Sequence, residues 1–365
     1  MKKTTILLIA IFALTACNTN KKNKLQSQEN AKMTLTTNKA VGEKISLKID
    51  ADADDQPDVW IDLNNNGVKD AEEADILFGS RKEYPLAAQT ITIHGPVKEF
   101  VCLLQKVTAL DVSKNSNLTY LVCSENKIQA LDVSKNSELT DLICADNKIK
   151  TLDVSKNSEL TELNCYRNEI QTLDLSKNSK LIALWCHFNQ IQTLDVSKNS
   201  KLIGLWCQFN QIQTLDVSKN SKLTMLDCSE NKIKTLDLSK NSKLTKLFCS
   251  QTEIQTLDIS KNSELTEIHC SENKIQTLDV SKHSALRCLD CSDNPHLSAL
   301  NVANGHNKDF EYPYSYGPAF NATSCPKLKE IKVDAGFASL VKSPPYNTPG
   351  DKKQWKKDPG ANYVE

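Results

Sequence analysis

The sequence lacks three features that would have suggested common functions. It has no net charge, because 45 Lys and Arg residues balance 45 Asp and Glu residues, and the lysines are dispersed singly. A basic face for nucleic acid or anionic lipid is therefore not expected. Beyond the N-terminus there is no apolar run long enough to cross a membrane.

Paired cysteines are also scarce, although the chain has 13 cysteines. Ten of them recur every 21 residues, and these ten contain no C-x-x-C pair that could grip a metal from one loop. The only close pair is Cys288 with Cys291. Most of the cysteines are therefore predicted to be small buried hydrophobes.

What the sequence has in abundance is a 21-residue repeat. The stretch LIALWCHFNQIQTLDVSKNSK from Leu181 is followed by LIGLWCQFNQIQTLDVSKNSK from Leu202. Ten repeats run in register from Val97 to His306, which we number as coils 1 to 10 with places 1 to 21, and place 6 is always cysteine. Cys186 precedes His187 in coil 5, but Gln208 replaces the histidine in coil 6. A nucleophile needs its base, so the pattern argues against a catalytic cysteine.

The spacing of apolar residues within a repeat predicts the fold. The apolar places are 1, 4, 6, 11, 14 and 16, with the alternation of a strand and no room for a helix. We predict a mainly β solenoid in which each coil contributes two short strands to two parallel sheets, at about 4.8 Å per coil. Asparagines at places 9 and 19, such as Asn126 and Asn136, are predicted to form ladders that satisfy loop backbone groups. Aspartates at place 15 are predicted to be neutralised by lysines three residues later.

The repeat resembles a known bacterial class. It contains two nested copies of L-x-x-L-x-[apolar]-x-x-N, as in 21-residue bacterial leucine-rich repeats. The recurring motif LDVSKNS resembles that of internalin-like envelope lipoproteins. The resemblance covers Val97 to His306 and implies a leucine-rich repeat solenoid. It does not identify a ligand, because a fold does not fix a function.

The N-terminal residues MKKTTILLIAIFALTAC predict export, since a basic start precedes a short apolar run and small residues. Leu14 to Cys17 resemble the lipobox of a bacterial lipoprotein, which implies that Cys17 carries lipid. The expected location is then the bacterial cell envelope, at the outer membrane or cell surface, with membrane contact only through this lipid. An ordinary signal peptide with an incidental cysteine is the alternative. Residues 18–33 are predicted to be a flexible tether.

Residues 34–96 are predicted to form a small β cap that contains a candidate calcium loop. The stretch DLNNNGVKDAEE fits D-x-[DN]-x-[DN]-G-x5-E in full. The predicted calcium ligands are Asp62, Asn64, Asn66, Val68, Asp70 and Glu73. A polar hairpin turn around Asn-Gly remains the alternative.

Beyond the repeats, residues 307–342 are predicted to cap the solenoid, with a proline-broken aromatic loop from Tyr312 to Phe320. Residues 343–365 are predicted to be a loosely ordered tail. Cys288 lies at the outward place 3, and Cys325 is its candidate disulfide partner in an exported chain.

The predicted binding face is the sheet face whose places 3, 5, 7 and 8 vary between repeats. In coils 5 and 6 these places carry several aromatic residues and no charge, as in the core of a protein interface. Ala183 and Gly204 at place 3 are predicted to leave the tryptophan rings approachable. The alternative is a duplicated aromatic coil whose rings only pack on each other. The candidate partner-binding residues are Tyr166, Trp185, His187, Phe188, Trp206, Gln208, Phe209 and Phe248.

Taken together, these patterns predict a lipid-anchored envelope protein that binds an extracellular protein in adhesion or another interaction role. A glycan ligand and a passive structural spacer are the alternatives. An enzyme is not expected, because the repeats offer no nucleophile, base and pocket in one place. No cofactor other than calcium is predicted.

Overall fold

The structure is a computed structural model that describes residues 31–314 and 317–365. The predicted signal peptide (1–17), its lipidation residue Cys17 and residues 18–30 of the predicted tether lie outside these residues. No helix in the described part of the chain is long and apolar enough to cross a membrane. Two compact units, Met1–Ile149 and Lys150–Glu365, divide the chain, and each is described by itself.

The N-terminal unit contains two sheets. One is antiparallel with the order β3 (Trp60–Asp62), β5 (Thr90–His94), β1 (Lys32–Thr37) and β7 (Val107–Lys114). The other runs β4 (Arg81–Pro85), β2 (Lys44–Asp50), β6 (Glu99–Val101), β8 (Tyr120–Val122) and β9 (Asp141–Ile143). Two short 3-10 helices, η1 (Gln56–Asp58) and η2 (Ala71–Ala74), connect strands.

The predicted β cap closes the first coil by strand pairing. Alternate residues of β1 and β2 are buried, which matches the alternation in the sequence. Strand β2 pairs antiparallel with β6 of coil 1, and β1 pairs antiparallel with β7 of the same coil. The cap therefore covers a backbone edge that would otherwise be open. It begins at Lys32, two residues before the predicted boundary.

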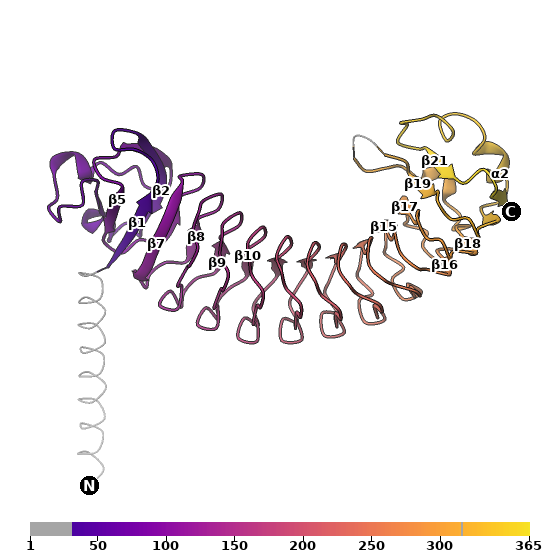
Figure 1. Ribbon diagram of the computed structural model, residues 1–365, viewed down its shortest axis with the longest axis horizontal. Helices are drawn as coiled ribbons and strands as arrows, with labels where there is room; N and C mark the ends of the chain where they lie inside the picture. Colours follow the sequence, from indigo (N-terminus) through magenta and orange to yellow (C-terminus); the bar gives the residue numbers. More distant parts are fainter. Residues whose placement is uncertain (1–30, 315–316) are drawn as a thin grey trace, which may run out of the picture. The chain divides into compact units, whose positions relative to one another are not determined.

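The C-terminal unit is a parallel β solenoid whose coils stack side by side (Figure 1). Its long sheet has the order β10 (Glu162–Asn164), β11 (Ala183–Trp185), β12 (Gly204–Trp206), β13 (Met225–Asp227), β14 (Lys246–Phe248), β15 (Glu267–His269), β17 (Cys288–Asp290), β19 (Phe320–Ala322) and β21 (Trp355–Lys357). Each strand pairs with the next in parallel and without a register shift, for example Leu184 with Leu205. The 21-residue repeat therefore aligns residues at the same place of neighbouring coils side by side.

The second sheet is shorter than the prediction of two strands for every coil. It consists of β16 (Thr277–Asp279), β18 (Ala299–Asn301), β20 (Glu330–Lys332) and β22 (Asn362–Val364). Between residues 150 and 276 the second side of the coils has no paired strand. Asparagine side chains join the coils there instead, and strand pairing begins in the coil where His283 replaces the asparagine of place 19.

Both predicted asparagine ladders are present. At place 9, Asn210 Nδ2 donates to the carbonyl oxygens of Cys186 and Cys207, and its Oδ1 accepts from the Ile191 N–H. At place 19, buried Asn220 donates to the carbonyls of Val196 and Asn199 in the preceding coil. These amides satisfy loop backbone groups that strand pairing does not reach.

The aspartates of place 15 act differently from the prediction. Asp195 Oδ1 accepts the backbone N–H of Ser197 at 2.8 Å. This bond and one from the Ser197 hydroxyl are the main causes that lower the pKa of Asp195, and Lys198 contributes less. The carboxylates therefore close local turns, and charge neutralisation by lysine is secondary.

The end of the chain differs from the predicted loose tail. Trp355 is buried and stacks on Phe320, with ring centroids 4.4 Å apart, and it also contacts Phe337. Strands β21 and β22 extend both sheets within residues 343–365. The 3-10 helix η3 (Asn307–Asp309) and the helix α2 (Phe337–Leu340) complete this cap. A tail with a buried tryptophan is ordered because leaving the ring in water would forfeit its apolar burial.

The predicted Cys288–Cys325 disulfide is wrong, because both thiols are free. Cys325 Sγ donates to the carbonyls of Cys291 and Thr323, each at 3.5 Å. These bonds correspond to those of a place-9 asparagine, such as the bonds from Asn294 to the Cys270 carbonyl of the preceding coil and to the Ser292 carbonyl. Cys325 thus ends the place-9 ladder, whereas Cys288 lies on the outer sheet face.

Candidate functional site

The side chains of coils 5 and 6 form parallel aromatic columns. Trp185 and Trp206 are register partners on β11 and β12, and their rings stack with centroids 4.7 Å apart and an interplanar angle of 6°. Phe188 and Phe209 stack at 4.1 Å with an angle of 11°. The near-identity of the two repeats therefore produces two pairs of stacked rings.

Place 8 projects its side chain from an uncommon backbone conformation. Phe188 and Phe209 have φ values of 52° and 55°, in the left-handed region that non-glycine residues rarely adopt. The residues at place 8 of the neighbouring coils, Arg167 and Glu230, share it. The conformation belongs to the fold, and Leu104 of coil 1 shares it, but aromatic side chains at this place are confined to coils 5 and 6. Both phenylalanines remain more than one third exposed.

Sequence reasoning missed two members of this surface. Ile182 and Ile203, at place 2, have exposed fractions of 42% and 44%. The signal was available, because place 2 is Lys, Thr or Arg in every other repeat. We define the aromatic face as Ile182, Trp185, Phe188, Ile203, Trp206 and Phe209. It is an exposed apolar surface within two repeats whose first 14 places carry no charge.

Gly204 has a different role from the one predicted. A Cβ atom at this position would lie 2.4 Å from Cζ3 and 2.5 Å from Cη2 of Trp206. The indole therefore lies directly over Gly204, so the glycine does not leave an open approach to the ring. It allows the ring to lie flat on the sheet, where Trp206 is half-buried.

The place-7 residues form a third column beside the tryptophans. The His187 ring stacks on Tyr166 with centroids 4.6 Å apart, and Gln208 follows in the next coil. Burial, with a smaller effect of Arg167, lowers the pKa of His187 to about 4. The imidazole is therefore neutral at physiological pH. Among the described residues, neither His187 Nδ1 nor Gln208 Oε1 has a hydrogen-bond partner.

Phe248 does not join the tryptophan column. Asp227 stands between Trp206 and Phe248 in the register of β12, β13 and β14. Phe248 instead stacks on His269, with centroids 4.9 Å apart. Burial raises the pKa of Asp227, although Ser229 partly offsets this effect. The charged boundary of the aromatic face therefore lies at coil 7.

Cys186 is a core residue and not a catalyst. It is fully buried, and burial raises the pKa of its thiol to about 12. The thiolate, which is the nucleophilic form, is therefore scarce at neutral pH. The other place-6 cysteines are buried as well, so they form a ladder along the interior.

The predicted calcium ligands lie in one closed loop of the N-terminal unit. Buried Asp62 accepts the N–H groups of Asn66 at 3.0 Å and Gly67 at 2.8 Å. Buried Glu73 accepts the N–H groups of Leu63 at 2.8 Å and Asp70 at 3.0 Å. The two carboxylates thus close the loop from both ends.

The middle of this loop follows the same pattern. Asn64 Oδ1 accepts from the Asn66 N–H, and Asn66 Oδ1 accepts from the Val68 N–H. Asn64 Nδ2 donates to Asp70 Oδ2 at 3.0 Å. The loop leads from β3 to η2, and β3 pairs with β5, so the alternative of a tight β-hairpin turn is wrong.

Comparisons with known proteins place the solenoid among leucine-rich repeats. No protein-family model and no curated protein matches the chain. The functional domain of InlJ from Listeria monocytogenes, described as including a cysteine ladder, is 36% identical with a TM-score of 0.58. The alignment covers 64% of this chain and 55% of the InlJ chain, so this chain spans little more than half of that structure.

Two further structures share the fold at lower identity. A leucine-rich repeat protein of Leptospira interrogans is 18% identical with a TM-score of 0.51, over 67% of this chain and 62% of its own. The internalin InlF of Listeria monocytogenes is 17% identical with a TM-score of 0.50, over 65% and 81%. The predicted internalin-like leucine-rich repeat solenoid is confirmed.

Proposed function

We propose that this internalin-like leucine-rich repeat protein binds an extracellular protein partner through the aromatic face of coils 5 and 6. Leucine-rich repeat domains generally bind protein partners. The observation that carries the proposal is the exposed set of Ile182, Ile203, Phe188 and Phe209 around two stacked tryptophans, within two repeats whose first 14 places carry no charge. Aromatic side chains are enriched, and charged ones depleted, at the cores of interfaces.

The geometry favours a protein over a glycan. Trp185 and Trp206 cover one face of each other, which reduces the ring surface on which a sugar could stack. The unpartnered polar atoms nearby, on His187 and Gln208, are buried and so do not offer hydrogen bonds to sugar hydroxyls. The exposed isoleucines add aliphatic surface that suits an apolar side chain of a partner. A glycan ligand and a passive spacer are the competing outcomes of the test.

The double substitution of Trp185 and Trp206 by alanine tests the proposal. The protein is first used to capture partners from extracellular and envelope fractions, and affinity for the captured partner is then measured. We expect the double variant to lose at least about 2 kcal/mol of binding free energy, as is typical for truncated aromatic hot spots. Replacing exposed Lys201 by alanine, in the same coil pair but at place 21, is the control and should change affinity little.

Unchanged affinity in the double variant would place the partner elsewhere on the protein. Capture of glycans alone, with competition by free sugars, would favour the glycan alternative. Failure to capture any ligand would favour the spacer.

The location in the envelope rests on the N-terminal sequence. The lipobox-like Leu14 to Cys17 supports lipid attachment at Cys17 and export to the bacterial envelope. A Cys17→Ser variant should leave the detergent phase on phase partitioning; retention there would contradict anchoring through this residue.

We also propose calcium at Asp62, Asn64, Asn66, Val68, Asp70 and Glu73. The closed loop that joins Asp62 to Glu73 supports this site, because the residues of the motif are already gathered in a single turn structure. Its expected role is to stabilise the N-terminal cap. The few charged ligands suggest weak, extracellular-type affinity, on the order of 0.1 to 1 mM.

A further inference from the structure

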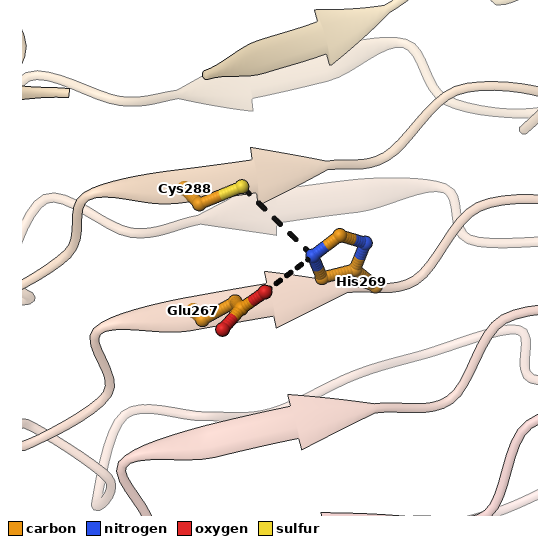
Figure 2. Close-up of side chains that lie close together, drawn as sticks. All are labelled: Glu267, His269 and Cys288. Atoms are coloured by element: carbon orange, nitrogen blue, oxygen red, sulfur yellow. Dashed lines mark hydrogen bonds and ion pairs between the residues drawn. The ribbon is translucent and has the colours of Figure 1, made fainter. Parts of the chain in front are cut away.

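A second cluster of chemically distinctive side chains lies on the same sheet face, at β15 and β17 (Figure 2). Glu267 and His269 are two residues apart on β15, so their side chains leave the same face of the sheet. Cys288 is the register partner of Glu267 on β17. This arrangement brings a carboxylate, an imidazole and a thiol together although Cys288 is 19 residues beyond His269.

The three donor atoms converge on one point. His269 Nε2 lies 3.0 Å from Glu267 Oε1 and 3.8 Å from Cys288 Sγ. All three donor atoms lie within 4.8 Å of one another. Figure 2 shows both contacts meeting at the same ring nitrogen.

This geometry does not fit a cysteine nucleophile with a histidine base. In such a site the carboxylate binds one imidazole nitrogen and the nucleophile binds the other. Here both groups approach Nε2, so one nitrogen would have to serve the two at once. Burial and the nearby carboxylates also raise the pKa of Cys288 well above its ordinary value, which opposes thiolate formation without a cation.

The cluster is enclosed by neighbouring side chains. The exposed fraction is 2% for the Glu267 side chain and 17% for that of His269. Phe248 stacks on the imidazole, and Tyr312 of the C-terminal aromatic loop meets it edge-on, with centroids 6.3 Å apart. Tyr312 therefore lies over the sheet face, whereas Phe320 at the end of the same loop is buried and stacks on Trp355.

Three charged groups surround the cluster and decide which cation it suits. Lys246 Nζ pairs with Glu267 Oε2 at 3.0 Å, which leaves Oε1 toward His269. Asp290 is the register partner of His269, and Asp227 lies two strands away in the same column. The net surroundings are acidic, so a divalent cation would be stabilised rather than repelled.

We propose that Glu267 Oε1, His269 Nε2 and Cys288 Sγ bind Zn²⁺, with a fourth position for water. Sulfur, nitrogen and oxygen ligands together suit zinc better than calcium or magnesium, which prefer oxygen alone. Zinc–ligand bonds of about 2.0–2.3 Å give tetrahedral ligand–ligand separations of about 3.4–3.6 Å. The observed 3.0 Å and 3.8 Å separations lie within about 0.4 Å of these values. Zinc would tie coil 9 to coil 10 beneath Tyr312.

The repeat supplies substitutions that the fold already accepts. Place 5 is Asn164 in coil 4, so His269→Asn is a native side chain for this place. Place 3 is Ala183 in coil 5, so Cys288→Ala is another. Glu267→Gln keeps the size of the third ligand. His187→Gln, which copies Gln208, removes a histidine outside the cluster and is the matched control.

Zinc binding to the purified protein is measured by equilibrium dialysis and by competition with a chromophoric chelator, in excess calcium to occupy the acidic loop. We expect one zinc per chain, and a thiolate-to-metal charge-transfer band when Co²⁺ replaces zinc. Each ligand variant should bind at least about 100-fold more weakly, because even outer-shell partners cost about 10- to 100-fold. The control should keep both affinity and band.

Thermal unfolding without metal identifies any variant that fails to fold. The ligand variants that do fold then test whether these side chains bind zinc. Absence of stoichiometric zinc binding in the parent protein would overturn the proposal. So would undiminished zinc affinity in a folded Cys288→Ala variant, or a cobalt complex without the charge-transfer band.

Discussion

Replacing Gly204 by alanine tests the arrangement of the aromatic face directly. The new Cβ would lie 2.4 Å from Cζ3 of Trp206, whereas ordinary contacts begin at 3.4 Å. The indole must therefore move by about 1 Å or turn away from the sheet. Either movement disturbs its stack on Trp185, whose centroid is 4.7 Å away.

The expected change in stability is small because two effects oppose each other. Losing an aromatic pair costs about 0.5–1.5 kcal/mol. Replacing glycine by alanine within a strand stabilises by roughly 0.5–1 kcal/mol, mainly through the unfolded chain. The net change in the free energy of unfolding is therefore expected to stay within about 1 kcal/mol of zero.

Near-ultraviolet circular dichroism is the more sensitive assay. The chain has four tryptophans, of which Trp60 stacks on His94 and Trp355 lies in the C-terminal core. Coupling between indoles should come from Trp185 and Trp206, and we expect it to be lost in Gly204→Ala. Partner affinity should fall by at least about 1 kcal/mol.

The matched control is Ala183→Gly, which removes a Cβ at the same place of coil 5 and introduces no clash. It should keep the indole coupling and most of the affinity. If Gly204→Ala keeps the coupling and binds the partner like the parent, the indole does not lie over Gly204 in solution, and the account of the aromatic face is wrong.

Two further predictions concern stability. Millimolar calcium should raise the unfolding temperature of the N-terminal unit relative to the same protein in chelator. An Asp62→Asn variant should lose most of this gain, because a charged ligand is removed. Identical unfolding temperatures with and without calcium would refute the site. Cys186→Ala should lower the free energy of unfolding by about 1 kcal/mol, as for deletion of one buried methyl-sized group, with partner affinity unchanged; a loss of affinity without a loss of stability would show that the thiol acts in binding.

The repeat made the solenoid and its ladders predictable, because places that recur every 21 residues must meet their equivalents in the next coil. Asn210 and Asn220 show this, since both donate to the coil that precedes them. The second sheet was overestimated because the spacing of Leu194 and Val196 is that of a strand, whereas side-chain amides join the coils at that side. The periodicity of apolar residues indicates which side chains are buried, but it does not indicate which hydrogen bonds join adjacent coils.

The errors at the sites have a similar origin. Cys325 was taken as a partner for Cys288 because both lie outside the ladder of place-6 cysteines, but an irregular stretch before Cys325 shifts it to place 9, where its thiol takes the hydrogen bonds of an asparagine. The burial of Trp355 was missed because one tryptophan in a proline- and lysine-rich segment forms no apolar pattern that would indicate a core. The cluster of Glu267, His269 and Cys288 could in principle have been found from the sequence, since place 3 of one coil adjoins place 3 of the next.

The ladder bonds also determine how the C-terminal unit can form from an unfolded chain. The amide bonds of Asn210 and Asn220 reach back 24 residues at most, and strand pairing joins residues 21 apart. Among the regular 21-residue repeats, every loop that must close is therefore short and nearly equal in length, which keeps the entropic cost of each step similar. Folding can begin at any adjacent pair of coils and advance by one coil at a time, and fraying at one end leaves the bonds of distant coils intact.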